Sequence, residues 1–172
     1  AAVPGRFASA AAGAVCLGGL VLILITARPD DRGIIDPPAF RTHVVVERVS
    51  AVWAAVASLM VGVQAATDAG VTPARLLSSG MLTSALGASE AARSWVAVAL
   101  CAAVLAVCAR LVLRWEWHVP LLIPAFIGVV AVPVTGNAGQ GPGHDYATGS
   151  VIVFTAALSV WAGLTITAAL HP

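Results

Sequence analysis

The sequence predicts an all-α, polytopic membrane protein with about five transmembrane helices and one short interfacial helix. Of its 172 residues, 59% are hydrophobic and only 10% are charged, and the mean hydropathy is +0.94. Because a soluble domain carries about 25% charged residues, this composition cannot cover a water-exposed surface. Five mostly uncharged runs approach the roughly 20 residues that a helix needs to cross a bilayer. We expect one transmembrane domain over residues 1–172, compatible with a fragment of a longer chain.

The first two helices are predicted at residues 7–27 and 44–66. Residues 7–27 are uncharged and lie between Arg6 and Arg28, which suit water-facing ends. A secretory signal is the competing interpretation, but its apolar stretch spans only roughly 7 to 15 residues. The second helix has a start signal at Asp36-Pro37-Pro38, an acidic cap followed by prolines in the first turn.

Three further helices are predicted at residues 94–113, 119–135 and 147–170. Arg110 lies near the end of the first of these, from which its side chain can reach the interface. The helix at 119–135 contains Pro120, Pro124 and Pro133 and is expected to be short or kinked. The five Trp residues mostly lie near segment ends, as an aromatic belt at the membrane interface would place them.

The segment between the second and third spans is too polar to cross a membrane and too apolar for an ordinary loop. Its apolar residues recur at spacings that place them on one side of a helix beginning after Thr72-Pro73. We expect a short interfacial helix at about residues 73–88, lying on the membrane.

The distribution of arginine predicts the orientation, because cytoplasmic loops retain positive charge. Three arginines fall on the side of the N-terminus and six on the other. The first group is Arg6, Arg75 and Arg93; the second is Arg28, Arg32, Arg41, Arg48, Arg110 and Arg114. The chain is therefore predicted to have its N-terminus outside and its C-terminus inside a bacterial plasma membrane.

Several function classes find no support in the sequence. Eight acids and nine bases give a net charge of +1, so no nucleic-acid partner is expected. No nucleophile–base pair, metal triad or cofactor fingerprint indicates an enzyme. The chain has only two Met, and neither a Met-x-x-Met nor a Cys-x-x-Cys copper motif occurs.

A Gly-rich loop at residues 136–146 is the most unusual stretch and ends in His144-Asp145-Tyr146. It lacks the Gly-Lys-Ser or Gly-Lys-Thr of a phosphate-binding loop. One interpretation is a flexible turn in which Asp145 caps the fifth helix. The other is an extracytoplasmic metal or proton site in which His144 and Asp145 are completed by Met81 or by another subunit.

A second charged cluster is predicted on the helix at 44–66 and just before it. His43 and Glu47 are four residues apart and share a helix face, with Arg48 adjacent and His118 on the same predicted membrane side. Two His facing each other across helices can ligate haem. Because both His are expected near the membrane surface and not within opposing spans, ion pairing or contact with lipid head groups is favoured over haem.

Small side chains form a strip on the same helix. Ser50, Ala54, Ser58 and Gly62 recur at every fourth position, so that another helix can approach closely. Ala10, Ala14 and Gly18 make a similar strip on the first helix, which in an Ala-rich sequence arises easily by chance.

The C-terminal third resembles a known family. The run from Thr135-Gly136-Asn137-Ala138 through Gly143-His144-Asp145 to Ala156–Leu164 is similar to the copper resistance D (CopD) family. In that family, a Gly-His-Ala element and a helix ending in Trp-x-Gly-Gly-Leu recur. Actinobacterial members are often fused to a CtaG-like cytochrome c oxidase assembly domain, and nine Arg with no Lys fit a GC-rich coding sequence of that kind.

The resemblance implies a plasma-membrane protein of copper transport, copper homeostasis or cytochrome c oxidase assembly, with copper as its ion and a respiratory oxidase as partner. Two positions depart from the family pattern: Asn137 replaces a His after Gly, and Phe154 replaces a His seven residues before the Trp. Both changes remove imidazoles that a copper path would use, while His144 remains. The alternative is a non-catalytic helical subunit that packs against a larger membrane complex.

Overall fold

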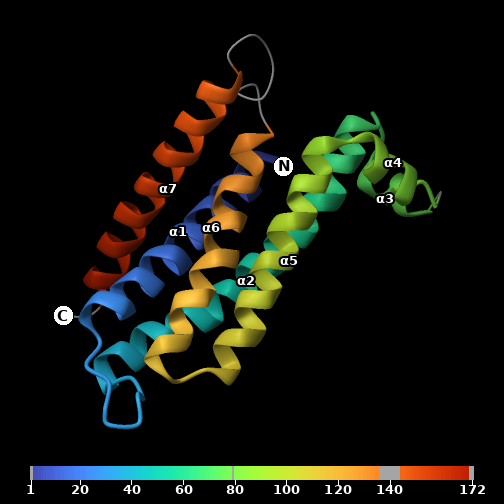
Figure 1. Ribbon diagram of the computed structural model, residues 1–172. Coiled ribbons are helices and arrows are strands. Elements are labelled where there is room, and N and C mark those ends of the chain that lie inside the picture. Colours follow the sequence, from blue (N-terminus) through green and yellow to red (C-terminus); the bar gives the residue numbers. More distant parts are fainter. Residues whose placement is uncertain (1, 79, 136–143, 171–172) are drawn as a thin grey trace.

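Five long helices form the framework of the protein (Figure 1). The computed structural model describes residues 2–78, 80–135 and 144–170, and the side chains of residues 2, 78, 144 and 145 lie outside that description. The long helices are α1 (Ala2–Thr26), α2 (Pro37–Asp68), α5 (Glu90–Leu111), α6 (His118–Val134) and α7 (His144–Ala169). Each is apolar and long enough to cross a membrane, α6 together with the turn at 115–117 that precedes it. The short elements are α3 (Pro73–Ser78), α4 (Leu82–Ala88) and the 3-10 turn η1 (Trp115–Trp117). The all-α prediction with five candidate spans is confirmed.

The second helix begins at the position that its start signal predicted. Pro37 and Pro38 occupy the first helical positions of α2, which continues for 32 residues, well beyond the predicted 44–66. Asp36 stands at the N-cap but forms no capping hydrogen bond. Its carboxylate instead accepts a hydrogen bond at 3.3 Å from the backbone N–H of Arg28, which ties the end of α1 to the start of α2.

The single interfacial helix predicted at 73–88 is wrong in number, because two short helices occupy this stretch. α3 ends at Ser78 and α4 begins only at Leu82. Gly80 between them has a φ of +65°, a left-handed conformation that interrupts a right-handed helix and suits glycine. Leu76 of α3 is fully buried and packs with Ala65, Ala66 and Ala92, so the α3–α4 unit covers the junction of α2 and α5.

The long helices run alternately up and down the bundle. α1 begins and α7 ends at opposite ends of the molecule, and the α3–α4 unit projects to one side at the end where α1 begins (Figure 1). α2 packs along α1 and α5, and α6 packs against α5 and α1. α1 is the most buried of the candidate spans, so it forms an integral part of the bundle.

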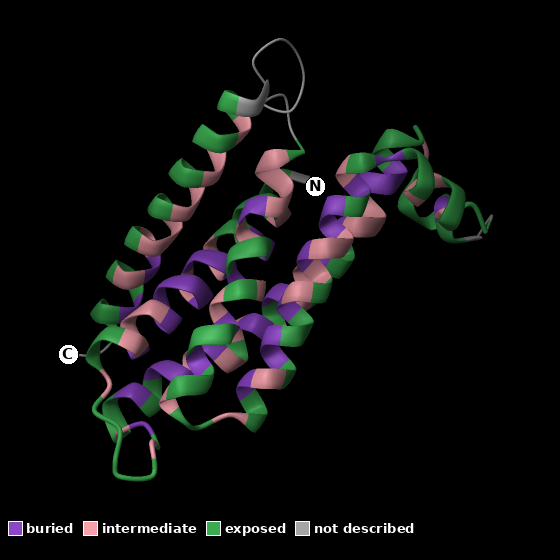
Figure 2. Ribbon diagram, in the orientation of Figure 1, coloured by how far each residue is buried: buried purple, intermediate pink, exposed green. Residues whose placement is uncertain are grey.

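The main core lies where α1, α2, α5 and α6 meet. Trp53 and Trp95 are almost fully buried in it, at 1% and 2% exposure, which makes the aromatic-belt interpretation wrong for these two residues. The indole N–H of Trp53 donates to the Ser9 hydroxyl at 2.9 Å, so burial leaves no polar atom of this ring unpaired. Figure 2 shows that buried positions concentrate on these four helices, whereas α7 is mostly exposed or half-buried.

Glycines bring α7 directly onto α1. A Cβ placed at Gly163 would overlap the Ala14 carbonyl, and one placed at Gly18 would overlap the backbone of Gly163. Backbones this close hold membrane helices together by dispersion contacts, without a hydrophobic driving force between them. Ala14 and Gly18, which composition alone would attribute to chance, therefore form a helix interface.

The strip predicted on α2 behaves differently. Only Ser50 is buried, Ala54 is half-buried, and Ser58 is exposed. A Cβ at Gly62 would meet no atom within 4 Å. The described chain therefore places no helix against Gly62, and packing of another helix against the Ser58–Gly62 half of the strip stays a prediction.

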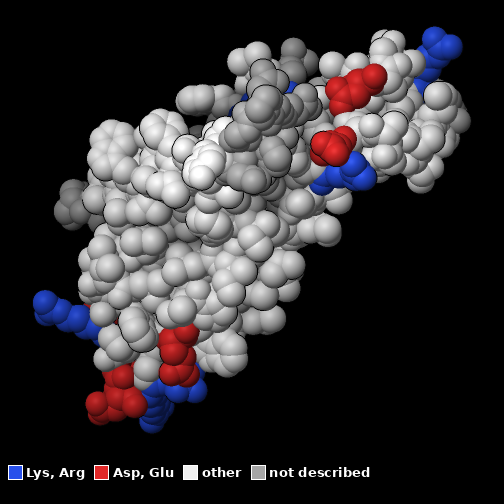
Figure 3. Space-filling view, turned by 45° about the horizontal axis from the view of Figure 1, so that its top comes forward, with Lys and Arg blue, Asp and Glu red and all other residues white. Residues whose placement is uncertain are grey.

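Charged side chains gather at the two ends of the molecule and leave an uncharged waist (Figure 3). Large apolar side chains are exposed across that waist, among them Phe126 of α6 and Phe154 and Trp161 of α7. A surface of this kind is stable against lipid tails and not against water. The chain is a membrane protein, and the direction in which it is inserted stays a prediction.

Candidate functional site

Two buried histidines contact each other at the end of the bundle where α2 and α6 begin. Nδ1 of His43 and Nε2 of His118 are 3.0 Å apart, and the rings meet edge to face with centroids 5.1 Å apart. His43 is 2% exposed and His118 is fully buried. His43 belongs to α2 and His118 is the first residue of α6, so the pair joins two helices.

The hydrogen-bond partners of His118 determine which ring nitrogens carry a hydrogen when both imidazoles are neutral. Its Nδ1 lies 3.0 Å from the Arg114 carbonyl oxygen and 3.3 Å from that of Trp115. Because a carbonyl only accepts, this nitrogen must carry the hydrogen. Nε2 of His118 is then the acceptor, and Nδ1 of His43 donates to it. The tautomers follow from the partners, as is usual for imidazoles.

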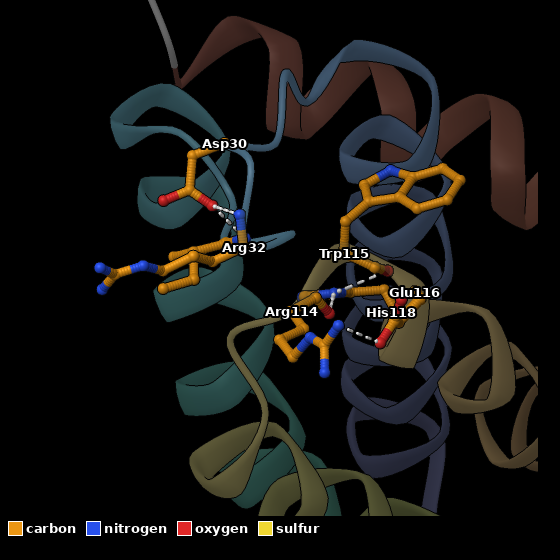
Figure 4. Close-up of polar contacts among 7 residues, drawn as sticks. Asp30, Arg32, Arg114, Trp115, Glu116 and His118 are labelled. Atoms are coloured by element: carbon orange, nitrogen blue, oxygen red, sulfur yellow. Dashed lines mark hydrogen bonds and ion pairs between the residues drawn. The ribbon is translucent and has the colours of Figure 1, made fainter.

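The connector between α5 and α6 positions His118, and the loop between α1 and α2 positions the connector. The N–H of Trp115 donates to the Gly33 carbonyl at 2.8 Å, and that of Ile35 donates to the Leu113 carbonyl at 3.2 Å. Asp30 shapes the loop by accepting from the backbone N–H of Arg32 at 2.9 Å. Figure 4 shows Arg114, Trp115 and Glu116 beside His118, and Asp30 with Arg32 on the neighbouring loop. Arg114 is directed toward Glu116, to which it is paired at 2.9 Å.

The predicted cluster of His43, Glu47 and Arg48 separates into two environments. His43 is not an interfacial group, because it is buried and bonded to His118. Glu47 points to the rim, where its carboxylate pairs with the Arg110 guanidinium at 3.1 Å. Arg48 is exposed. Lipid head-group contact therefore stays a prediction for Arg48, whereas it is wrong for His43, which is buried.

The histidine pair meets one condition for haem ligation and fails another. The two rings do face each other from different helices, at the end of the bundle where α2 and α6 begin. However, nitrogens bound to opposite sides of one metal, at bonds of about 2 Å, lie about 4 Å apart, whereas these nitrogens are 3.0 Å apart and share a hydrogen bond. In this arrangement no haem iron fits between them.

The metal site predicted from His144, Asp145 and Met81 falls in large part outside the described residues. His144 and Asp145 are the first residues of α7, but their side chains, like residues 136–143, lie outside the described part. Met81 precedes α4 and is 49% exposed. The α3–α4 unit and α7 lie on opposite sides of the bundle (Figure 1), so Met81 lies away from α7 in this chain, and a metal or proton site at His144 and Asp145 stays a prediction. Among the described residues, no group of three or more His, Cys, Asp or Glu is placed to hold a metal ion.

A polar network at the opposite end of the bundle was not predicted from the sequence. The Arg6 guanidinium donates to the Gln64 side chain at 2.8 Å, whose amide donates to the Asp68 carboxylate at 2.8 Å. Asp68 also accepts a hydrogen bond from the Ser89 hydroxyl, and Ser89 caps α5 by accepting from the N–H of Ala92 at 2.9 Å. The only available signal was a Ser–Glu pair at the start of a predicted helix.

Comparison with known proteins places this chain beside mycobacterial proteins of much greater length. It is 53% identical over 166 residues to uncharacterized proteins of Mycobacterium bovis and Mycobacterium tuberculosis, and 49% identical to one of Mycobacterium leprae. The chain is similar to part of each. The matches cover 96% of this chain and 25% of each relative. No family model matches the chain, and no solved structure does.

Chemically, the histidine pair offers two imidazole groups inside a membrane bundle, near the end of it that carries the loop between α1 and α2. Paired imidazoles can share or pass a proton, and they are suitable ligands for copper and zinc. Two ligands do not make a closed metal site. The arrangement therefore suits a site that an ion or proton occupies in passing.

Proposed function

We propose that this chain is the membrane part of a protein of copper transport, copper homeostasis or cytochrome c oxidase assembly, located in a bacterial plasma membrane. The observation that carries the proposal is the buried contact between His43 and His118. Ionisable side chains inside membrane bundles are costly and mark ion or proton pathways, and imidazole is a good copper ligand. The similarity of residues 135–164 to the CopD family supports copper as the ion.

Copper would be the cargo of this site. An ion bound between two imidazoles at bonds of about 2 Å requires nitrogens about 4 Å apart, compared with the 3.0 Å separation of the hydrogen-bonded pair. A change in side-chain torsions by which the rings part would open this gap. The hydrogen bond between His43 and His118 would be present in the empty site and broken in the occupied one. Loss of that bond would lower the affinity for copper and favour its release.

The relatives are compatible with this assignment. Each is about four times as long as the matched segment, since the match covers 25% of its length. A second membrane domain, such as the CtaG-like domain fused to actinobacterial CopD proteins, would be accommodated in that length. A respiratory oxidase would be the partner that receives the copper.

Copper(I) titration of the full protein in lipid nanodiscs against a chromogenic chelator tests the proposal. We expect saturable binding that weakens by more than tenfold in His43→Asn and in His118→Asn. His144→Asn provides the matched comparison, because it removes the imidazole of the loop site and leaves the pair intact. Copper binding that persists in His43→Asn and His118→Asn but disappears in His144→Asn would show that the ion binds at the Gly-rich loop and not at the histidine pair.

A cellular measurement distinguishes binding from function. Cells without the protein should change their total copper content or the copper content of their oxidase, and His118→Asn should reproduce that change. Unaltered copper content and oxidase metallation in cells without the protein would overturn the proposal.

The alternative function, a helical subunit of a larger membrane complex, is favoured by one observation. Ser58 is exposed on α2 and the space at Gly62 is open, so half of the small-residue strip is available to another helix. Under this alternative, Gly62→Leu would abolish co-purification of other membrane proteins. Purification of the full protein as a solitary folded monomer would argue against it.

A further inference from the structure

A second polar site lies inside the bundle, away from the histidine pair. A partly open cavity of about 220 Å³ is lined by residues of α1, α2, α5, α6 and α7. Its polar and aromatic lining residues are Arg6, Ser9, Trp53, Trp95, Thr155 and Ser159. An apolar cavity of about 150 Å³ accommodates benzene, so this one fits a molecule of about ten non-hydrogen atoms.

Two hydroxyls on α7 lack the partners that others on the same helix have. The hydroxyls of Ser150, Thr165 and Thr167 donate to backbone carbonyls one turn earlier, at 2.7 to 2.9 Å. Thr155 and Ser159, which are one turn apart and line the cavity, form no hydrogen bond with any described residue. A hydroxyl inside a membrane bundle normally finds a partner, so these two are left for a molecule in the cavity.

The two indole rings extend this pattern. The N–H of Trp53 is taken by Ser9 at 2.9 Å, whereas the side chain of Trp95 is 2% exposed and makes no hydrogen bond to the described part of the chain. Both rings line the cavity. The two rings form an apolar surface, and the indole N–H of Trp95 is a hydrogen-bond donor at its edge. Such a surface suits a flat ring that carries a polar substituent.

Arg6 supplies the charge of this site. It is an exposed residue on the first turns of α1. One N–H group of its guanidinium donates a hydrogen bond to the Gln64 side chain at 2.8 Å. The remaining donors of a guanidinium form a planar fork that matches a carboxylate. Among the residues that the structure describes, no His, Cys, Met, Asp or Glu lines the cavity, so its described lining differs in chemistry from a copper site.

We propose that this cavity binds a small aromatic carboxylic acid that also carries a hydroxyl or carbonyl group. Its carboxylate lies at Arg6, its ring lies against Trp53 and Trp95, and its polar substituent reaches the hydroxyls of Thr155 and Ser159. The inference is independent of copper, because it uses none of the residues assigned to the histidine pair.

Isothermal titration calorimetry of the full protein in lipid nanodiscs, with empty nanodiscs subtracted, tests this site. The probes are para-hydroxyphenylacetate, phenylacetate and para-cresol, which retain or lack the hydroxyl and the carboxylate. We expect saturable binding of the first, about three- to tenfold weaker binding without the hydroxyl, and about ten- to hundredfold weaker binding without the carboxylate.

Variants assign these losses to residues. In Thr155→Val with Ser159→Ala, para-hydroxyphenylacetate should bind no better than phenylacetate, and in Arg6→Gln it should bind no better than para-cresol. Ser150→Ala is the matched control on α7, because its hydroxyl is bonded within the helix, and it should bind as the wild type does. Helix content measured by circular dichroism should be equal in all variants. Absence of saturable binding by the wild type, or affinity ratios that no variant changes, would overturn the inference.

Discussion

Nδ1 of His43 and Nε2 of His118 lie 3.0 Å apart although the residues are 75 positions apart in the chain. The contact joins the first turns of α2 and α6. Nδ1 of His118, on the other side of its ring, is within hydrogen-bond distance of the carbonyl oxygens of Arg114 and Trp115. Imidazoles completely removed from solvent are stable only when their nitrogens are paired. Each histidine therefore depends on the other.

This dependence predicts a non-additive effect on stability. His43→Leu or His118→Leu alone should lower the free energy of unfolding by about 1–3 kcal/mol, because each leaves its partner buried and unpaired. The double variant should cost clearly less than the sum of the two single changes. Unfolding in a mixed-micelle denaturant titration measures all four proteins. Additive losses would show that the contact contributes nothing.

The close approach of α1 and α7 predicts a position that tolerates no side chain. Gly163→Val should destabilise the protein by about 1–3 kcal/mol or displace α7, because a Cβ there overlaps the Ala14 carbonyl. Gly149→Ala is the control on the same helix, where a Cβ meets no atom within 4 Å. It should leave thermal unfolding unchanged or raise the midpoint slightly, since alanine favours helices.

The polar network at the start of α5 predicts that the Ser89 hydroxyl contributes to the stability of the protein. Ser89→Ala should destabilise the protein by about 1 kcal/mol, because it removes the N-cap of α5 and a donor to Asp68. Ser84→Ala provides the comparison: that residue is exposed and its hydroxyl bonds only the Met81 carbonyl of its own turn. Thermal unfolding should distinguish the two variants, and equal midpoints would contradict the role of the network.

The predicted orientation can be tested at two exposed positions on opposite ends. Ser84 lies on α4 and Asp31 in the loop between α1 and α2. In a background without Cys16, Cys101 and Cys108, Ser84→Cys should react with a membrane-impermeant maleimide in intact cells. Asp31→Cys should react only after permeabilisation. The reverse pattern would place the N-terminus inside.

Sequence patterns predicted the long helices because hydropathy is a local property. A run of about 20 apolar residues must satisfy its backbone internally wherever it meets lipid, so the number of spans did not depend on how they pack. Local signals also located the start of α2 at Pro37. The break at Gly80 was missed because a helical spacing of apolar residues does not show which glycine takes a left-handed conformation.

The contacts between helices could not be predicted in this way. In a chain rich in small residues, the strips on α1 and α2 looked alike, yet Gly18 meets Gly163 while Gly62 faces open space. The two histidines were placed on one membrane side, but their contact needs α2, the connector after α5 and the loop after α1 together. The cavity between Arg6 and Ser159 is formed by five helices and has no sequence pattern.

The amino-acid sequence was sufficient to predict a membrane protein with five long apolar helices, because too few charged residues exist to build a surface for water. Only the tertiary structure decided which side chains are paired. In a bundle surrounded by lipid, apolar faces are nearly equivalent, so the partners of each helix depend on close backbone approach and on hydrogen bonds between distant residues. The contact between His43 and His118 and the free hydroxyls of Thr155 and Ser159 are consequences of that packing.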